Sequence, residues 1–215
     1  MGSRLGVGRN VLSVVAPHSG SGKTAFVTHL IPHIPGLGCL KVSPAHDWPE
    51  RSTFDEQAGG AGYFTEDTDR SHRAGTDTAS FLAAGAACVE RLRHRSGGLR
   101  LGLAAALKKF PPGMPVAVES SSAVRLVSPV CVVMVVRPPI REMKPTSHDV
   151  LPVVTDLLLN ASDRMDSDAE AERLVKEFPG LRPTHTWSCD LSLEPPPIDM
   201  LRRLRGLLCG QPTTC

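Results

Sequence analysis

Residues 10–30 constrain the fold of this chain more than any other part of the sequence. The stretch begins with an apolar run over residues 11–16, and its valine-rich composition is typical of a buried parallel strand. A short loop rich in glycine and serine follows. The spacing of apolar residues after that loop predicts a helix. A strand, a Gly-rich loop and a helix with Gly-Lys-Thr at the junction form the pattern of a phosphate-binding loop.

The chemistry of such a loop follows from its backbone and from two side chains. The first N–H groups of a helix have no partner within the helix and carry partial positive charge, so they bind anions. Lys23 can reach the β- and γ-phosphates of a nucleotide, and Thr24 offers a hydroxyl to Mg²⁺. Pro17 stands where the pattern has its first glycine, so we expect the start of the loop to differ. The residues expected to contact the nucleotide phosphates are Ser19, Gly20, Ser21, Gly22, Lys23, Thr24 and Ala25.

Strand and helix patterns alternate along the rest of the chain. They include a helix predicted over residues 76–87 and a helix that opens with a capping box formed by Ser167 and Glu170. We therefore expect an α/β fold, a three-layer P-loop NTPase domain with a mostly parallel central sheet that spans residues 1–215. A ligand would lie at the carboxyl ends of the strands. Residues 45–74 are polar and Gly-rich, and they are predicted to form a long loop at that edge. A substrate-binding or lid loop and a simple insertion are both open interpretations of this segment.

Three acids fall near the predicted carboxyl edge of the sheet. Asp47 follows the second strand, where it holds Mg²⁺ through water, orients the attacking water, or only caps a loop. Asp77 lies at a helix start, where it is either a helix-stabilising acid or a ligand of the metal or the substrate. Glu119 ends an apolar strand, a position suited to an acid beside the metal. The predicted catalytic set is therefore Lys23, Asp47 and Glu119, and the predicted metal set is Thr24, Asp77 and Glu119.

The segment Asn160-Ala161-Ser162-Asp163 follows another apolar strand. Guanine-specific proteins place Asn-Lys-x-Asp after such a strand, where the Asp accepts from the guanine ring and the Asn braces the site. Adenine lacks that pair of donors, which would leave a buried Asp unpaired. Asn160 and Asp163 are thus candidates to bind guanine, although a turn and helix start would use the same residue types.

Composition and charge indicate which binding partners and which cell compartment to expect. The net charge of +2 and an aromatic content of 4% do not favour a nucleic-acid or membrane surface. Six cysteines occur without a Cys-x-x-Cys pair, so free thiols in a reducing cytosol are expected in place of a zinc site or disulfide framework. The first residues lack the apolar core of a signal peptide. We therefore expect a cytoplasmic protein.

Four segments together resemble a known family. They are S-G-S-G-K-T in the loop, L-K-V-S-P-A-H-D after the second strand, R-A-G-T-D-T-A-S-F-L-A-A-G-A, and V-A-V-E. The set is similar to that of molybdopterin-guanine dinucleotide biosynthesis protein B. The positions that match by residue are Lys41, His46, Gly75, Asp77, Ala84, Gly85, Ala86 and Glu119. Pro17, Ala25 and Ser120 depart from the family pattern.

The resemblance implies a Mg·GTP-binding protein with slow hydrolysis, a homodimer, and a protein partner in molybdenum cofactor biosynthesis. Arg70 and Arg73 are then candidates to act across the dimer. Two alternatives remain open. One is an ATP-dependent small-molecule kinase or a ligase like dethiobiotin synthetase. The other is a nucleotide-binding adaptor or metallochaperone without catalytic activity.

Overall fold

The computed structural model describes residues 4–6, 8–45, 62–67, 75–140, 142–161 and 165–210. The strands are β1 (Val11–Val15), β2 (Gly38–Pro44), β3 (Tyr63–Asp67), β4 (Cys88–His94), β5 (Val116–Glu119), β6 (Pro129–Val136), β7 (Asp156–Asn160) and β8 (His185–Cys189). The α-helices are α1 (Lys23–Leu30), α3 (Asp77–Ala83), α4 (Leu99–Lys109), α5 (Pro145–His148), α6 (Ser167–Glu177) and α7 (Ile198–Cys209). Four short 3₁₀ helices are also described: η1 (Ile31–His33), η4 (Ser96–Gly98), η5 (Val124–Leu126) and η6 (Leu151–Val153).

One eight-stranded sheet runs through the molecule in the order β3-β4-β2-β5-β1-β6-β7-β8. All neighbours pair in parallel except β3, which is antiparallel to β4. This confirms the predicted α/β fold with a mostly parallel sheet. The prediction of a continuous loop over residues 45–74 is wrong, because β3 lies within it and extends the sheet at one edge.

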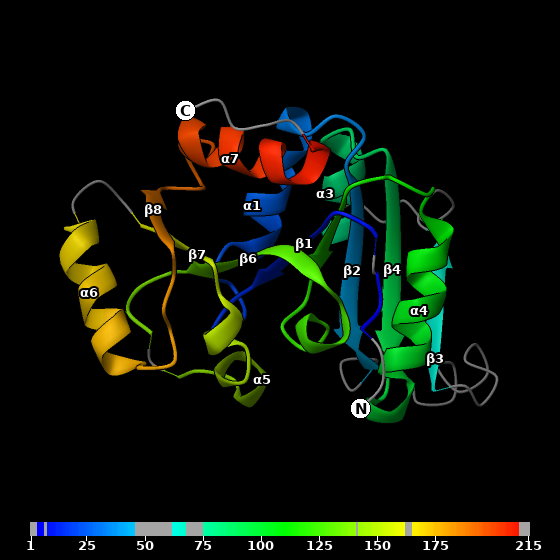
Figure 1. Cartoon of the computed structure of the whole chain (residues 1–215), viewed down its shortest axis with the longest axis horizontal. Helices are drawn as coiled ribbons and strands as arrows, with labels where there is room; N and C mark the ends of the chain where they lie inside the picture. Colours follow the sequence, from blue (N-terminus) through cyan, green and yellow to red (C-terminus); the bar gives the residue numbers. More distant parts are fainter. Residues whose placement is uncertain are drawn as a thin grey trace.

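Helices cover both faces of the sheet and make three layers (Figure 1). On one face α1, α3 and α7 bury a cluster that includes Phe26, Phe81 and Met200. On the other face α4 packs on one half of the sheet and α6 on the other, through Leu103 and Leu174 respectively. Alternate residues of β1 enter the two faces, which is the period of a strand buried on both sides.

Two predicted helix boundaries differ from the structure. The helix expected over residues 76–87 ends at Ala83, because Gly85 takes a left-handed φ of +90° that a helix cannot continue. We expected Ser167 and Glu170 to form a capping box, but the N-cap is Asp166, whose carboxylate accepts from the Ala169 N–H at 3.1 Å. The sequence pattern thus located that helix and misplaced its cap by one residue.

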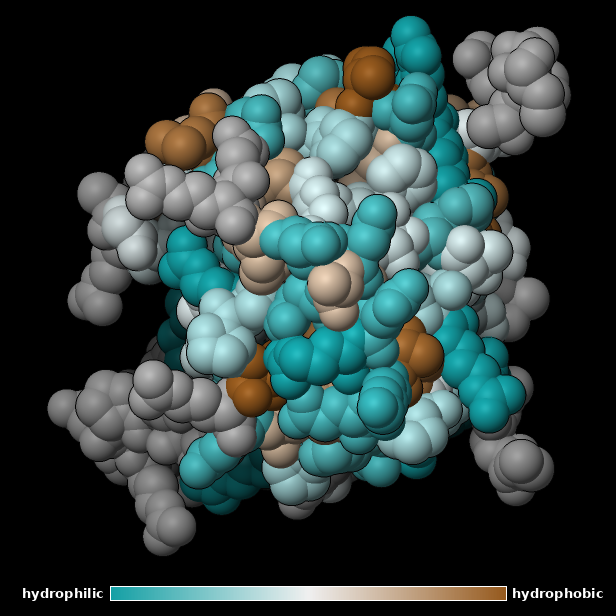
Figure 2. Space-filling view, turned by 90° about the vertical axis from the view of Figure 1, so that its left-hand side faces the viewer, coloured by the Kyte–Doolittle hydropathy of each residue, from teal (hydrophilic) through white to brown (hydrophobic). Residues whose placement is uncertain are grey.

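The surface on the side of α6 and β8 is largely hydrophilic, and its hydrophobic residues form scattered patches (Figure 2). Helix α6 contributes an exposed ion-pair ladder, in which Arg173 contacts Glu170 and Glu177. Within the described part of the chain, the helices lack the length and apolarity that a membrane span requires.

Candidate functional site

The loop between β1 and α1 is shaped by two glycines in the left-handed region. Gly20 has φ +79°, and Gly22, the N-cap of α1, has φ +104°. Helix α1 begins at Lys23, so the N–H groups of its first turn open onto the loop. A Cβ at Gly22 would overlap the side-chain nitrogen of Asn160. Glycine is therefore required there for both conformation and space.

Asn160, at the carboxyl end of β7, braces this loop. Its amide nitrogen donates to the Ser21 carbonyl at 3.0 Å, and its amide oxygen accepts from the Leu191 N–H at 3.0 Å. His29 of α1 contacts the Leu191 carbonyl at 3.0 Å. The side chain of Asn160 is 4% exposed, and both ends of its amide are engaged within the protein. It therefore joins the phosphate loop to the segment after β8.

Replacing Asn160 with alanine should reveal this bracing role. The Ser21 carbonyl and the Leu191 N–H would lose their partner, and a buried polar group left unpaired costs about 1–3 kcal/mol. We expect a lower melting temperature and an equal loss of affinity for GTP and ATP, measured by calorimetry and nucleotide titration. A loss confined to GTP would contradict bracing and assign Asn160 to base recognition.

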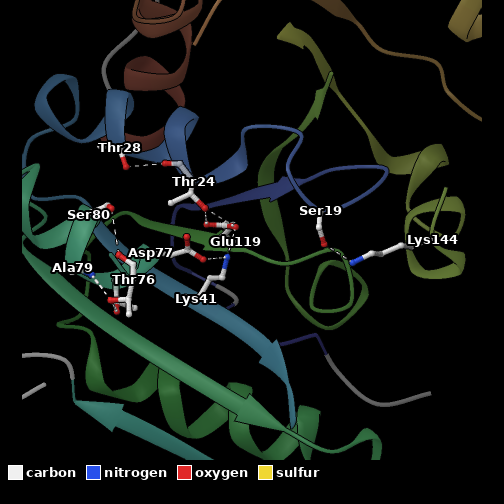
Figure 3. A network of polar contacts seen from close by, with 11 residues as sticks. Ser19, Thr24, Thr28, Lys41, Thr76, Asp77, Ala79, Ser80, Glu119 and Lys144 are labelled. Atoms are coloured by element: carbon white, nitrogen blue, oxygen red, sulfur yellow. Dashed lines mark hydrogen bonds and ion pairs between the residues drawn. The ribbon is translucent and has the colours of Figure 1, made fainter. Parts of the chain in front are cut away.

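A cluster of charged side chains lies beside the loop, on the face of the sheet that carries α1 and α3 (Figure 3). Glu119 ends β5 and is 2% exposed. Its carboxylate accepts from the Thr24 hydroxyl at 3.2 and 3.3 Å. The Lys41 ammonium, from β2, lies 2.5 Å from Glu119 and 2.6 Å from Asp77 at the start of α3. Two acids from segments distant in the sequence thus converge on one cation.

Strand register explains this convergence. Glu119 pairs with Val14 of β1 on one side and with Lys41 of β2 on the other. Paired residues of adjacent strands project from the same face of a sheet, so Glu119 and Lys41 meet. Thr76 caps α3 by accepting from the Ala79 N–H, which places Asp77 in the first turn of the helix above Lys41.

The pKa values within the cluster favour the charged forms. Burial disfavours ionisation of Asp77, yet hydrogen bonds from Lys41 and Thr24 hold its pKa below the ordinary value. Burial would lower the pKa of Lys41, but the nearby Glu119 and Asp77 raise it instead. Asp77 and Lys41 are therefore both charged at neutral pH.

Lys23 differs from Lys41. Among the residues that the structure describes, no carboxylate oxygen comes within 4 Å of its ammonium. Burial lowers the pKa of Lys23, and the more distant Glu119 opposes that shift. A partly buried ammonium beside a row of open N–H groups is an electropositive site without a bound counter-charge.

The remaining predicted residues are distributed as follows. Ser19 lies at the open side of the loop, where it accepts from Lys144. Ser21 is fully buried and its hydroxyl donates to the His18 carbonyl at 3.1 Å. Ala25 packs against the core. The predictions made for Asp47, Asp163, Arg70 and Arg73 lie outside the described residues.

Oxygen ligands suited to Mg²⁺ are present at this site. Thr24, Asp77 and Glu119 supply a hydroxyl and two carboxylates, and the ammonium of Lys41 between the acids shows that they hold a cation. Over the described ranges, no group of three or more His, Cys, Asp or Glu side chains could hold a metal alone. Mg²⁺ is usually bound by one or two carboxylates together with substrate phosphates and waters, which fits this set.

Two cations of the site, Lys41 and Lys144, were not predicted as site residues. Lys41 entered only as a position of family resemblance, although a lysine in an otherwise apolar strand is a usable signal. Nothing local marks Lys144, because its approach to the loop depends on how the chain returns after β6.

The parallel sheet, the loop between β1 and α1, and the acid at the end of the adjacent strand β5 are those of the P-loop NTPase fold. No protein-family model matches the chain, and no curated protein matches it. Among solved structures, the chain is similar to LpxK from Aquifex aeolicus, in an "apo" form in complex with ATP. That likeness has a TM-score of 0.46 and 14% sequence identity, and it covers 85% of this chain and 71% of LpxK. A likeness this distant assigns neither substrate nor reaction.

Proposed function

We propose that this chain binds a Mg·nucleoside triphosphate at residues 19–25, with GTP as the expected nucleotide, and hydrolyses it slowly. The observation that carries the proposal is the uncompensated positive charge of Lys23 at the open N-terminus of α1. A polyphosphate supplies the missing negative charge, and its oxygens accept from the N–H groups beside it. The loop, braced by Asn160, is preorganised for such a ligand.

In the proposed complex each residue has a defined task. The backbone around Gly20 and Gly22 contacts the phosphates, and Lys23 neutralises their β and γ oxygens. Thr24, Glu119 and Asp77 would hold Mg²⁺, which when bound neutralises charge that develops on the transferring phosphoryl group. Lys41 then exchanges part of its contact with these acids for a contact with the ligand. Positioning and electrostatics supply most of the catalysis in this class.

The arrangement also supports the proposed relation to molybdopterin-guanine dinucleotide biosynthesis protein B. That resemblance rests on separate sequence segments that contain Lys41, Asp77 and Glu119, and these three residues form one contiguous cluster beside Thr24. We therefore propose an accessory role in molybdenum cofactor biosynthesis, as a homodimer with a partner enzyme. The long segment after β2 and Asp47 within it would act at the same edge.

A second candidate function is favoured by the sheet face beyond Lys41. Arg91 pairs in register with Lys41, and Arg93 pairs with Ser43, so positive charge continues along β4 from the phosphate site. Glu66 of β3 forms an ion pair with each of them, at 3.6 Å from Arg91 and 3.7 Å from Arg93, so the two arginines share one carboxylate in β3. This surface suits an anionic acceptor, as an ATP-dependent kinase or ligase would require.

Titration with fluorescent GTP and ATP analogues, with and without Mg²⁺, tests the proposal directly. A Lys23→Ala variant should lose about two orders of magnitude in affinity, because truncating one partner of a desolvated charge contact costs about 2–5 kcal/mol. Lys176→Ala, an exposed lysine on α6, is the matched control and should bind normally.

The outcomes separate the candidates. Mg²⁺-dependent GTP binding that ATP does not compete supports the guanine proposal. Binding of ATP alone favours the kinase or ligase. If neither nucleotide binds the wild-type protein, the proposed function is wrong.

A further inference from the structure

The segment after β6 returns to the start of the phosphate loop and is hydrogen-bonded to it. The Lys144 backbone N–H donates to the Pro17 carbonyl at 3.0 Å. The Ser147 hydroxyl, fully buried, donates to the Ala16 carbonyl at 2.7 Å. Pro17 has no N–H of its own and replaces the usual first glycine, so this part of the loop is held from outside. These two hydrogen bonds therefore hold residues 144–147 against the start of the loop.

This anchoring directs a cation toward the open side of the loop. The ammonium of Lys144 donates to the Ser19 hydroxyl at 3.0 Å (Figure 3). Across the described segments, no carboxylate lies within ion-pair distance of it. Two cations without ion pairs thus face the same loop from different elements.

We propose that Lys144 is a catalytic cation that contacts the β- and γ-phosphate oxygens in cis. This inference rests on the proposed function. In hydrolysis, a water oxygen forms a bond to the γ-phosphorus, and the bond between the γ-phosphorus and the β–γ bridging oxygen breaks. The bonding electron pair leaves with the diphosphate, and the water proton passes to phosphate. Lys144 transfers no proton. It stabilises the negative charge that accumulates on the bridging and γ oxygens.

Lys144 is better suited to this task than the other candidates. Lys41 is engaged by two carboxylates, so moving it toward phosphate separates ion pairs. Lys144 gives up only a neutral hydroxyl, and a phosphate oxygen is a stronger acceptor. A cation in the same chain also removes the need for an arginine supplied by a second subunit. Turnover remains slow in proteins that carry such a cation in cis, about 10⁻² s⁻¹.

The test compares triphosphate with diphosphate. Lys144→Ala should weaken binding of a non-hydrolysable triphosphate at least about tenfold more than binding of the diphosphate, and should lower turnover about 10²–10³-fold. Lys144→Arg should restore much of the triphosphate preference, because it keeps the charge. Lys108→Ala, an exposed lysine on α4 at the opposite face, is the matched control and should change neither quantity.

Structural effects are separated by a further variant. Ser147→Ala removes the anchor to Ala16 but keeps the ammonium and the backbone bond from Lys144 to Pro17. It should therefore lower the melting temperature and preserve the triphosphate preference of the folded protein. If Lys144→Ala weakens both nucleotides equally, or changes neither, the inference is overturned while the proposed function stands. If the wild-type protein binds no nucleotide, both are overturned.

Discussion

Replacing Asp156 with alanine is expected to lower the free energy of unfolding by about 3–5 kcal/mol, the usual cost of removing one partner of a buried charge pair. Asp156 begins β7 and is fully buried. Its carboxylate accepts from Thr155 at 2.8 Å, from Cys131 and Trp187 at 3.1 Å each, and from Arg203 of α7 at 3.1 Å. The melting temperature should fall by roughly 10 °C in a chain of this size.

The matched control for Asp156→Ala is Arg202→Ala, on the helix α7 that also carries Arg203. It removes an exposed ion pair with Asp199 and should change the free energy of unfolding by no more than about 0.5 kcal/mol.

The contribution of Asp156 to stability should also depend on pH. Burial disfavours the charge of Asp156, but bonds from Arg203 and Trp187 keep its pKa below the ordinary value. A carboxyl whose pKa is lower in the folded state stabilises that state at every pH above its pKa in the unfolded chain, which is near 4. This stabilisation is lost as the pH falls through the pKa of the folded state.

The stability difference between the wild type and Asp156→Asn should therefore be full at neutral pH and shrink in acid. Equal differences at pH 7 and pH 3 would contradict a charged Asp156. Because Asp156 lies at the amino end of β7, away from the phosphate loop, the folded variant should retain normal nucleotide affinity. Thermal unfolding across pH and one nucleotide titration supply both measurements.

Replacing Glu119 with glutamine is expected to remove the Mg²⁺ dependence of nucleotide binding and to lower turnover about 10²–10³-fold. An amide keeps the shape of the side chain but loses the charge that would hold the metal together with Thr24. The magnitude is that of losing one preorganised electrostatic contact to the transition state. Binding and hydrolysis measured over a range of Mg²⁺ concentrations test it.

Glu177→Gln, half exposed on α6, is the control for the same chemical change. It should leave both the Mg²⁺ dependence and the turnover intact. Retention of full Mg²⁺ dependence by Glu119→Gln would remove this residue from the proposed metal site. The metal would then have to be sought near Asp77 or within residues 46–61.

The elements that sequence analysis located best are those set by local pattern. Strand β1 was predicted within one residue, and helix α1 was predicted to follow the glycine-rich loop, because a buried apolar run, two glycines and Lys-Thr specify a strand, a turn and a helix start over a few positions. Strand β3 was missed, because its Tyr-Phe-Thr-Glu-Asp sequence gains its order from pairing with β4, whose residues come about 25 positions later.

By itself, the sequence determined that this chain forms an α/β fold with a phosphate-binding loop, because short segments of sequence determine local backbone geometry and the burial of apolar residues. Only the tertiary structure decided which charges meet. Strand register placed Lys41 between Glu119 and Asp77, and the return of the chain after β6 brought Lys144 to Ser19. Such contacts join residues tens of positions apart, so they depend on sheet order, and no local pattern encodes them.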